Sequence, residues 1–184
     1  FLGRPDDTPA GDAFERRLYV CRRTIEKKAD AEFALRDKIF YVCSMSSRTI
    51  VYKGMLVATQ MRRFFIDLND AAVKTAVALV HSRYSTNTTP SWERAHPNRF
   101  IIHNGEINTL KGNVNWIRAR EPNLYSPVLQ HDLERVMPII NREGSDSAIL
   151  DNVLEFLVMN GRPLTRAASM LLPEPWDHLS LIHI

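Results

Sequence analysis

Hydrophobic residues recur every three or four positions along several stretches of the chain, a spacing typical of helices with one buried face. The stretch 12–29 is the first of these. It places Phe14, Leu18, Cys21 and Ile25 on one stripe, with charged residues elsewhere. The pattern predicts a helix against the core and makes Cys21 a small buried packing residue.

Four further helices are expected in the second half of the chain: one capped by Asn108 or Thr109 and running to about Glu121, a short one within 133–140 ended by Pro138, one over 146–160, and one over 166–172. The helix over 146–160 has the clearest pattern. The run Ser145-Asp146-Ser147 supplies polar residues for its start, and Asn160-Gly161 is typical of a helix end.

Hydrophobic runs rich in β-branched and aromatic residues predict strands over 38–45, 48–53, 75–81 and 99–103. The first two are close enough to form a hairpin across Ser46-Ser47. Strands therefore gather early and helices late, which favours the α+β class over an alternating βαβ arrangement.

Two polar runs follow the last two predicted strands, one from His81 to Asn87 and one from His103 to Asn108. Arg83 offers a planar fork suited to a carboxylate, although it could equally tie loops together. The Asn104 side chain and the Gly105 N–H could form a two-donor oxyanion hole, or the pair could be a hairpin turn. Because a helical pattern follows Gly105, we favour the oxyanion role. We expect the two strand ends to be neighbours in one sheet and to open on the same cleft.

Composition narrows the possible functions. The chain has 184 residues and a net charge of +3, with basic residues scattered among acidic ones. This distribution gives no case for nucleic-acid binding, which needs a clustered basic patch. No hydrophobic run is long enough for a membrane span, and neither the two cysteines nor the six scattered histidines show the spacing of a metal site.

The runs His-Ser-Arg-Tyr-Ser-Thr-Asn-Thr, Pro-Ser-Trp-Glu-Arg-Ala and His-Asn-Gly-Glu-Ile-Asn-Thr-Leu-Lys-Gly-Asn-Val-Asn-Trp resemble the glutaminase domain of the glutamate synthase large subunit, a class II glutamine amidotransferase. The resemblance implies an N-terminal-nucleophile hydrolase fold, a stacked αββα sandwich. It also implies hydrolysis of L-glutamine to glutamate and ammonia, with the ammonia passed to 2-oxoglutarate in a synthase domain of the same polypeptide. FMN and an iron–sulfur cluster are implied for the full-length enzyme, and no cofactor for this part of it.

The resemblance also implies roles for single residues. Arg83 would bind the α-carboxylate of glutamine and Asp146 its α-amino group, although Asp146 taken alone is a first-turn acid favoured by the helix dipole. Asn104 and Gly105 would form the oxyanion hole. Two hydroxyl residues, Ser85 and Thr86, would add contacts to the substrate or serve only the loop. His81 and His103, at the strand ends, are interpreted as structural.

Some positions depart from the family pattern. The family's nucleophile is a cysteine at the mature N-terminus, whereas Phe1 is not cysteine and Cys21 and Cys43 are internal. We therefore interpret residues 1–176 as an amidotransferase domain incomplete at both ends, followed by an atypical tail over 177–184. Such a chain would bind glutamine but release no ammonia by itself. At Thr89 the family usually has a bulky aromatic residue.

Two alternatives stay open from the sequence. One is a non-catalytic module that keeps a glutamine pocket. The other is a different class II amidotransferase, such as an asparagine or glucosamine-phosphate synthase. Nothing suggests secretion, so the expected compartment is the cytoplasm, or a plastid if the source is a plant or alga.

Overall fold

The computed structural model describes residues 3–33, 40–84, 89–105, 107, 110–141 and 144–172. The α-helices in these ranges are α1 (Asp12–Phe33), α2 (Ala58–Phe64), α3 (Leu110–Arg120), α4 (Leu133–Val136), α5 (Asp146–Met159) and α6 (Leu164–Leu171). Short 3-10 helices cover Ile66–Asn69, Trp92–Arg94, Glu121–Asn123 and Gln130–Asp132. The helices predicted from the second half of the sequence are confirmed, but the cap predicted at Asn108 or Thr109 lies outside the described residues. The predicted tail at 177–184 lies outside the described residues.

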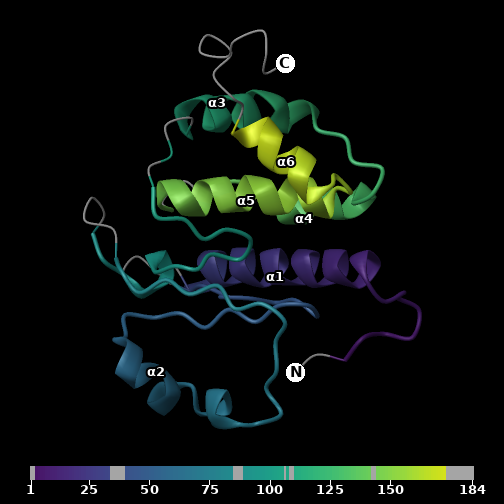
Figure 1. Cartoon of the computed structure of the whole chain (residues 1–184). Helices are drawn as coiled ribbons and strands as arrows, with labels where there is room; N and C mark the ends of the chain where they lie inside the picture. Colours follow the sequence, from purple (N-terminus) through teal and green to yellow (C-terminus); the bar gives the residue numbers. More distant parts are fainter. Residues whose placement is uncertain are drawn as a thin grey trace, which may run out of the picture.

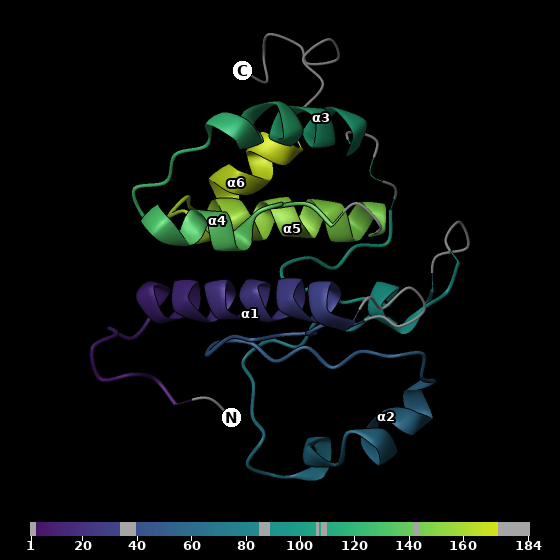
Figure 2. The ribbon, with the colours of Figure 1, turned by 180° about the vertical axis from the view of Figure 1, so that it is seen from behind.

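The helices stack in layers (Figures 1 and 2). Helices α3 and α6 cover one side of α5, and α1 lies along the other side next to α4. The hydrophobic core lies between these layers. Its buried members are Tyr19, Val20, Leu129, Val136, Ile139, Ile140, Ile149, Leu150, Val153, Leu154, Phe156, Met159, Ala167 and Leu171.

Helix α5 supplies the largest share of this core because its sequence carries both a hydrophobic face and clear end signals. The Ser145 side chain caps its first turn by accepting a hydrogen bond from the Ala148 N–H at 3.2 Å. At the other end, Gly161 takes a positive φ of 83°, a conformation that glycine adopts without steric cost. The prediction for this helix was therefore right at both ends.

The buried face of α1 differs from the predicted one. Cys21 is exposed and Ile25 is 38% exposed, so the expected packing role of Cys21 was wrong. Charged residues lie buried on the helix instead, notably Arg22 at 1% and Glu26 at 8% exposure. A hydrophobicity pattern treats a charged position as solvent-facing. Arg22 is buried because its charge meets carboxylates inside the protein.

The four predicted strands do not form hydrogen-bonded strands in the part of the chain that the structure describes. Extended stretches of 40–53 and 71–84 instead run on the side of α1 away from α5 (Figures 1 and 2). The stretch expected to be buried is open to solvent, with Val77 71% and Val80 83% exposed. A run of β-branched residues indicates only that the side chains suit a pleated, half-buried surface. A strand also needs a partner segment with which its main chain can hydrogen-bond.

Candidate functional site

The two regions expected to bind opposite ends of one substrate meet at a single side-chain contact. The Nε2 atom of His103 lies 2.7 Å from the Oγ atom of Ser147. His103 directly precedes Asn104 and Gly105, and Ser147 directly follows Asp146 in the first turn of α5. The contact therefore brings the candidate oxyanion residues to the N-terminal end of the helix that carries the candidate amino-group ligand.

The hydrogen bonds around His103 indicate which of its two ring nitrogens carries a proton toward Ser147. The Gly105 N–H donates to Nδ1 at 3.3 Å, so Nδ1 is an acceptor and the ring proton is on Nε2, facing Ser147. The Ser147 hydroxyl is then free to donate to Asp146 Oδ1 at 3.3 Å, and the Ser147 N–H donates to the same oxygen at 2.7 Å. The other Asp146 oxygen accepts no hydrogen bond from the described residues and can receive one from a ligand.

Three histidine rings connect the two polar runs. The ring centroid of His96 lies 4.9 Å from that of His81 and 5.0 Å from that of His103. Burial, followed by the neighbouring His103 and His81, lowers the pKa of His96 to about 4. His96 is therefore neutral at pH 7. His96 thus joins His81 to His103, but the sheet expected to hold the two runs is not formed among the described residues.

Arg83 follows His81 by two residues in the sequence. Its side chain is exposed and makes no hydrogen bond or ion pair with the described residues. The next residue is fixed, because the Tyr84 hydroxyl donates to the Ser91 carbonyl at 2.9 Å and accepts from the Ser91 N–H at 3.0 Å. The Arg83 guanidinium is thus exposed and available to a carboxylate, next to a residue whose side chain is held. The other two predicted contact residues, Ser85 and Thr86, lie outside the described residues.

Asn104 and Gly105 are both exposed. Helix α3 begins at Leu110, which agrees with the helix entry expected after Gly105. An oxyanion hole needs donors that can reach a ligand. The exposed Asn104 amide meets this requirement, whereas the Gly105 N–H must leave His103 Nδ1 to do so.

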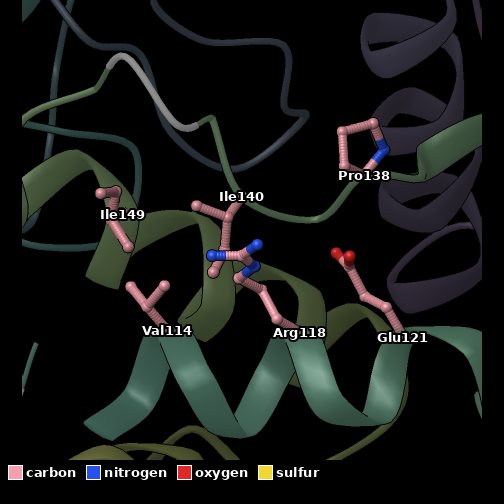
Figure 3. Close-up of a pocket in the computed structure, with 6 residues that line it drawn as sticks. All are labelled: Val114, Arg118, Glu121, Pro138, Ile140 and Ile149. Carbon is pink, nitrogen blue, oxygen red and sulfur yellow. The ribbon is translucent and has the colours of Figure 1, made fainter. Parts of the chain in front are cut away.

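A separate pocket lies between α3, α5 and the segment 138–140 (Figure 3). It has a volume of about 220 Å³, and its wall consists of Val114, Arg118, Glu121, Pro138, Ile140 and Ile149. None of the residues predicted to contact glutamine lines it. Its wall is mainly aliphatic, which suits the core boundary better than an amino-acid zwitterion.

The described residues do not fit an iron–sulfur cluster, one of the cofactors implied for the full-length enzyme. Iron–sulfur clusters are held mainly by cysteines, commonly four. The chain has two. Cys21 is exposed on α1, and burial raises the pKa of Cys43, which keeps its thiol protonated. Among the described residues, no group of three His, Cys, Asp or Glu side chains could hold a metal ion.

The sequence pattern did not single out two residues that the structure places near this site. His96 was passed over although it directly follows the quoted run that ends at Ala95. Asp151 was also passed over. Asp151 could have been noticed as an acidic residue between Leu150 and Val153, on the apolar face of α5. Its exposed fraction there is 1%.

The comparison with known proteins bears directly on these motifs. The family profile of the class II glutamine amidotransferases matches residues 1–183. Over 176 residues, 96% of this chain, the sequence is 53% identical to the "Glutamate synthase [NADPH] large chain" of Bacillus subtilis. It is 48% identical over 91% of this chain to the "Glutamate synthase [NADH]" of Schizosaccharomyces pombe. It is 44% identical, again over 91%, to the chloroplastic "Ferredoxin-dependent glutamate synthase" of Spinacia oleracea.

These relatives are far longer than the chain. It spans 11% of the Bacillus protein, 8% of the yeast protein and 10% of the spinach protein. No helix in the described ranges has the length and apolar character needed to cross a bilayer. Because the family profile covers nearly every residue, the chain belongs to the class II glutamine amidotransferases.

Proposed function

We propose that this chain is the glutamine-binding part of a glutamate synthase, in which glutamine is hydrolysed to glutamate and ammonia. The observation that carries the proposal is the His103–Ser147 contact, since it joins the Asn104–Gly105 corner to Asp146. Relatives named as glutamate synthases, with 44–53% identity over most of the chain, support this member of the family over an asparagine or glucosamine-phosphate synthase.

Each residue has a role suited to its surroundings. The exposed guanidinium group of Arg83 binds the α-carboxylate of glutamine through two parallel hydrogen bonds. The free oxygen of Asp146 accepts from the α-ammonium group, while its other oxygen is held by Ser147. The Asn104 amide and the Gly105 N–H donate to the oxygen of the side-chain amide as it becomes negatively charged. Ser85 and Thr86 add hydroxyl contacts beside Arg83.

The attacking group is a cysteine thiol with a free α-amine, as the family resemblance implies. In the longer polypeptide, ammonia passes to 2-oxoglutarate in a synthase domain, where FMN and an iron–sulfur cluster supply the redox chemistry. The αββα sandwich is the architecture we propose for the complete domain, and residues 1–176 are its share of this chain. The compartment we propose is the cytoplasm, or the plastid in a plant or alga.

The test is calorimetry of L-glutamine binding to the chain and to three variants. A hydrogen bond to a charged group contributes about 1.5–3 kcal/mol. Arg83→Ala and Asp146→Asn should therefore each weaken binding about ten- to a hundredfold. Asn104→Ala should leave binding nearly unchanged, because its donor meets a charge that exists only in the transition state. The same variant should lose turnover in a version that extends upstream to a terminal cysteine, measured as ammonia release.

Arg118→Ala is the matched control for Arg83→Ala. Arg118 is also an exposed arginine, but it lines the pocket of Figure 3. If Arg118→Ala weakens glutamine binding and Arg83→Ala does not, the ligand occupies that pocket and the assigned site is wrong. Glutamine binding without ammonia release by the cysteine-bearing version would instead favour a non-catalytic binding module.

A further inference from the structure

One buried carboxylate holds the backbone just before the Asn104–Gly105 corner. The Asp151 side chain accepts three consecutive main-chain hydrogen bonds: from the Arg99 N–H at 3.2 Å, from Phe100 at 2.7 Å and from Ile101 at 3.0 Å. The carbonyl of Ile101 in turn accepts from the Asn98 N–H at 3.0 Å, which closes the segment into a tight turn. Successive N–H groups that converge in this way form a concave site for an anion, and here the anion is Asp151.

This carboxylate connects the two halves of the proposed glutamine site. Asp151 lies on α5, five residues after Asp146, and helix geometry fixes the separation of the two. On the other side it holds 99–101, two residues before His103. The distance between Asn104 and Asp146 is therefore set at two places, by the His103–Ser147 contact and by Asp151.

The side chain of Arg99 strengthens the same segment. It donates to the Val42 carbonyl at 2.5 Å and to Glu26 at 2.9 Å, and its guanidinium lies 4.4 Å from the centre of the Tyr41 ring. Asp151 thus holds this short turn through its main-chain N–H groups, and the Arg99 side chain anchors the same turn to Val42, Glu26 and Tyr41.

We propose that Asp151 is a positioning residue for glutamine hydrolysis: its carboxylate holds the turn 99–101 so that the Asn104 donor faces the substrate bound by Asp146. The inference rests on the proposed function and extends it to a residue that touches no substrate. Asp151 acts through Asn104, so its removal affects the step in which Asn104 acts more than it affects binding of the substrate.

The decisive variant is Asp151→Asn, which keeps the size of the side chain but leaves one oxygen to accept from three N–H groups. In the full-length enzyme we expect kcat for ammonia release to fall about ten- to a hundredfold, since small misplacements of a catalytic group have effects of this size. KM should change far less. In an Asn104→Ala background, the same substitution should cause little further loss, because both changes remove one interaction.

Glu155→Gln is the matched control. Glu155 is also buried, lies one turn further along α5 and hydrogen-bonds Arg22 at 2.5 Å, but it makes no bond to 99–101. It should lower stability while leaving kcat unchanged in the folded enzyme. If Asp151→Asn and Glu155→Gln lower kcat alike, Asp151 has a general structural role and the proposal is wrong. The same holds if the losses in kcat caused by Asp151→Asn and Asn104→Ala multiply in the double variant.

Amide exchange on the unsubstituted chain tests the geometry without relying on a variant that folds. The amide protons of Phe100 and Ile101 should exchange as slowly as those within α5, and rapid exchange would overturn the proposal. The proposed function fails separately, if the unsubstituted enzyme releases no ammonia from glutamine.

Discussion

Replacing Arg22 by methionine tests the buried charges between α1 and α5 most directly. Arg22 is 1% exposed. It donates to both oxygens of Glu26, at 3.0 and 2.8 Å, and to Glu155 at 2.5 Å. Glu26 keeps two other arginine partners, Arg23 and Arg99, when Arg22 is removed. Glu155 keeps no ion-pair partner among the described residues, so most of the loss should arise there.

The expected size follows from leaving a buried charge without a partner. Removing one member of a buried ion pair destabilises proteins by about 3–5 kcal/mol, whereas replacing both members by hydrophobic residues is often neutral. Arg22→Met should therefore lower the free energy of unfolding by about 3–5 kcal/mol. The double variant Arg22→Met/Glu155→Leu should recover a large part of this loss.

Urea unfolding at pH 7, followed by circular dichroism, measures both changes. The control is Arg17→Ala, which removes an ion pair to Asp7 whose side chains are 57% and 73% exposed. That change should cost less than about 1 kcal/mol. If Arg22→Met costs no more than the control, or if the double variant is less stable than Arg22→Met, the unpaired-charge explanation is refuted.

Three further predictions follow from local contacts. The pKa of His96 is lowered to about 4, so the unfolded chain binds a proton before the folded chain does as pH falls below 6.5. The folded state is therefore destabilised, and the difference in free energy of unfolding between the unsubstituted protein and His96→Asn should shrink as pH falls from 6.5 to 4. Burial and the charge of Glu155 raise the pKa of Asp151 to about 6. The difference in free energy of unfolding between the unsubstituted protein and Asp151→Asn should therefore shrink as pH rises from 4 to 6. Urea unfolding at several pH values checks both, and a difference that does not change with pH contradicts either one. Ser145→Ala should lower stability by about 1 kcal/mol in the same assay through loss of the α5 cap, while Ser145→Thr should retain most of it.

Local sequence signals were sufficient for most helices. The position of α5 followed from its polar start, its hydrophobic face and Gly161, all within a few residues of the ends they define. The end of α4 was equally accessible, because Pro138 limits what the neighbouring backbone can do. Such signals act within one or two turns, so a single sequence contains them in full.

The features that the sequence did not predict depend on distant partners. Arg22 is buried because Glu155 is there to receive it, and Asp151 is buried because three main-chain N–H groups converge on it. The exposed state of Val77 and Val80 reflects the lack of a paired segment in the part of the chain described, which alternation of residue types does not specify. Within the candidate site, Asn104, Asp146 and Arg83 were predicted by motif, and their roles stay a prediction. The contacts between the rings of His81, His96 and His103 required coordinates.

The ion pair between Arg22 and Glu155 also constrains the order of events during synthesis. Its members are 133 positions apart. At about 5–20 residues per second, a ribosome needs about 7–27 s to add Glu155 after Arg22. During this time Arg22 can form only its pair with Glu26, and the face of α1 that packs on α5 stays open to water. A nascent chain released or cleaved before Glu155 would therefore expose that face, which makes it a target for chaperones and proteases.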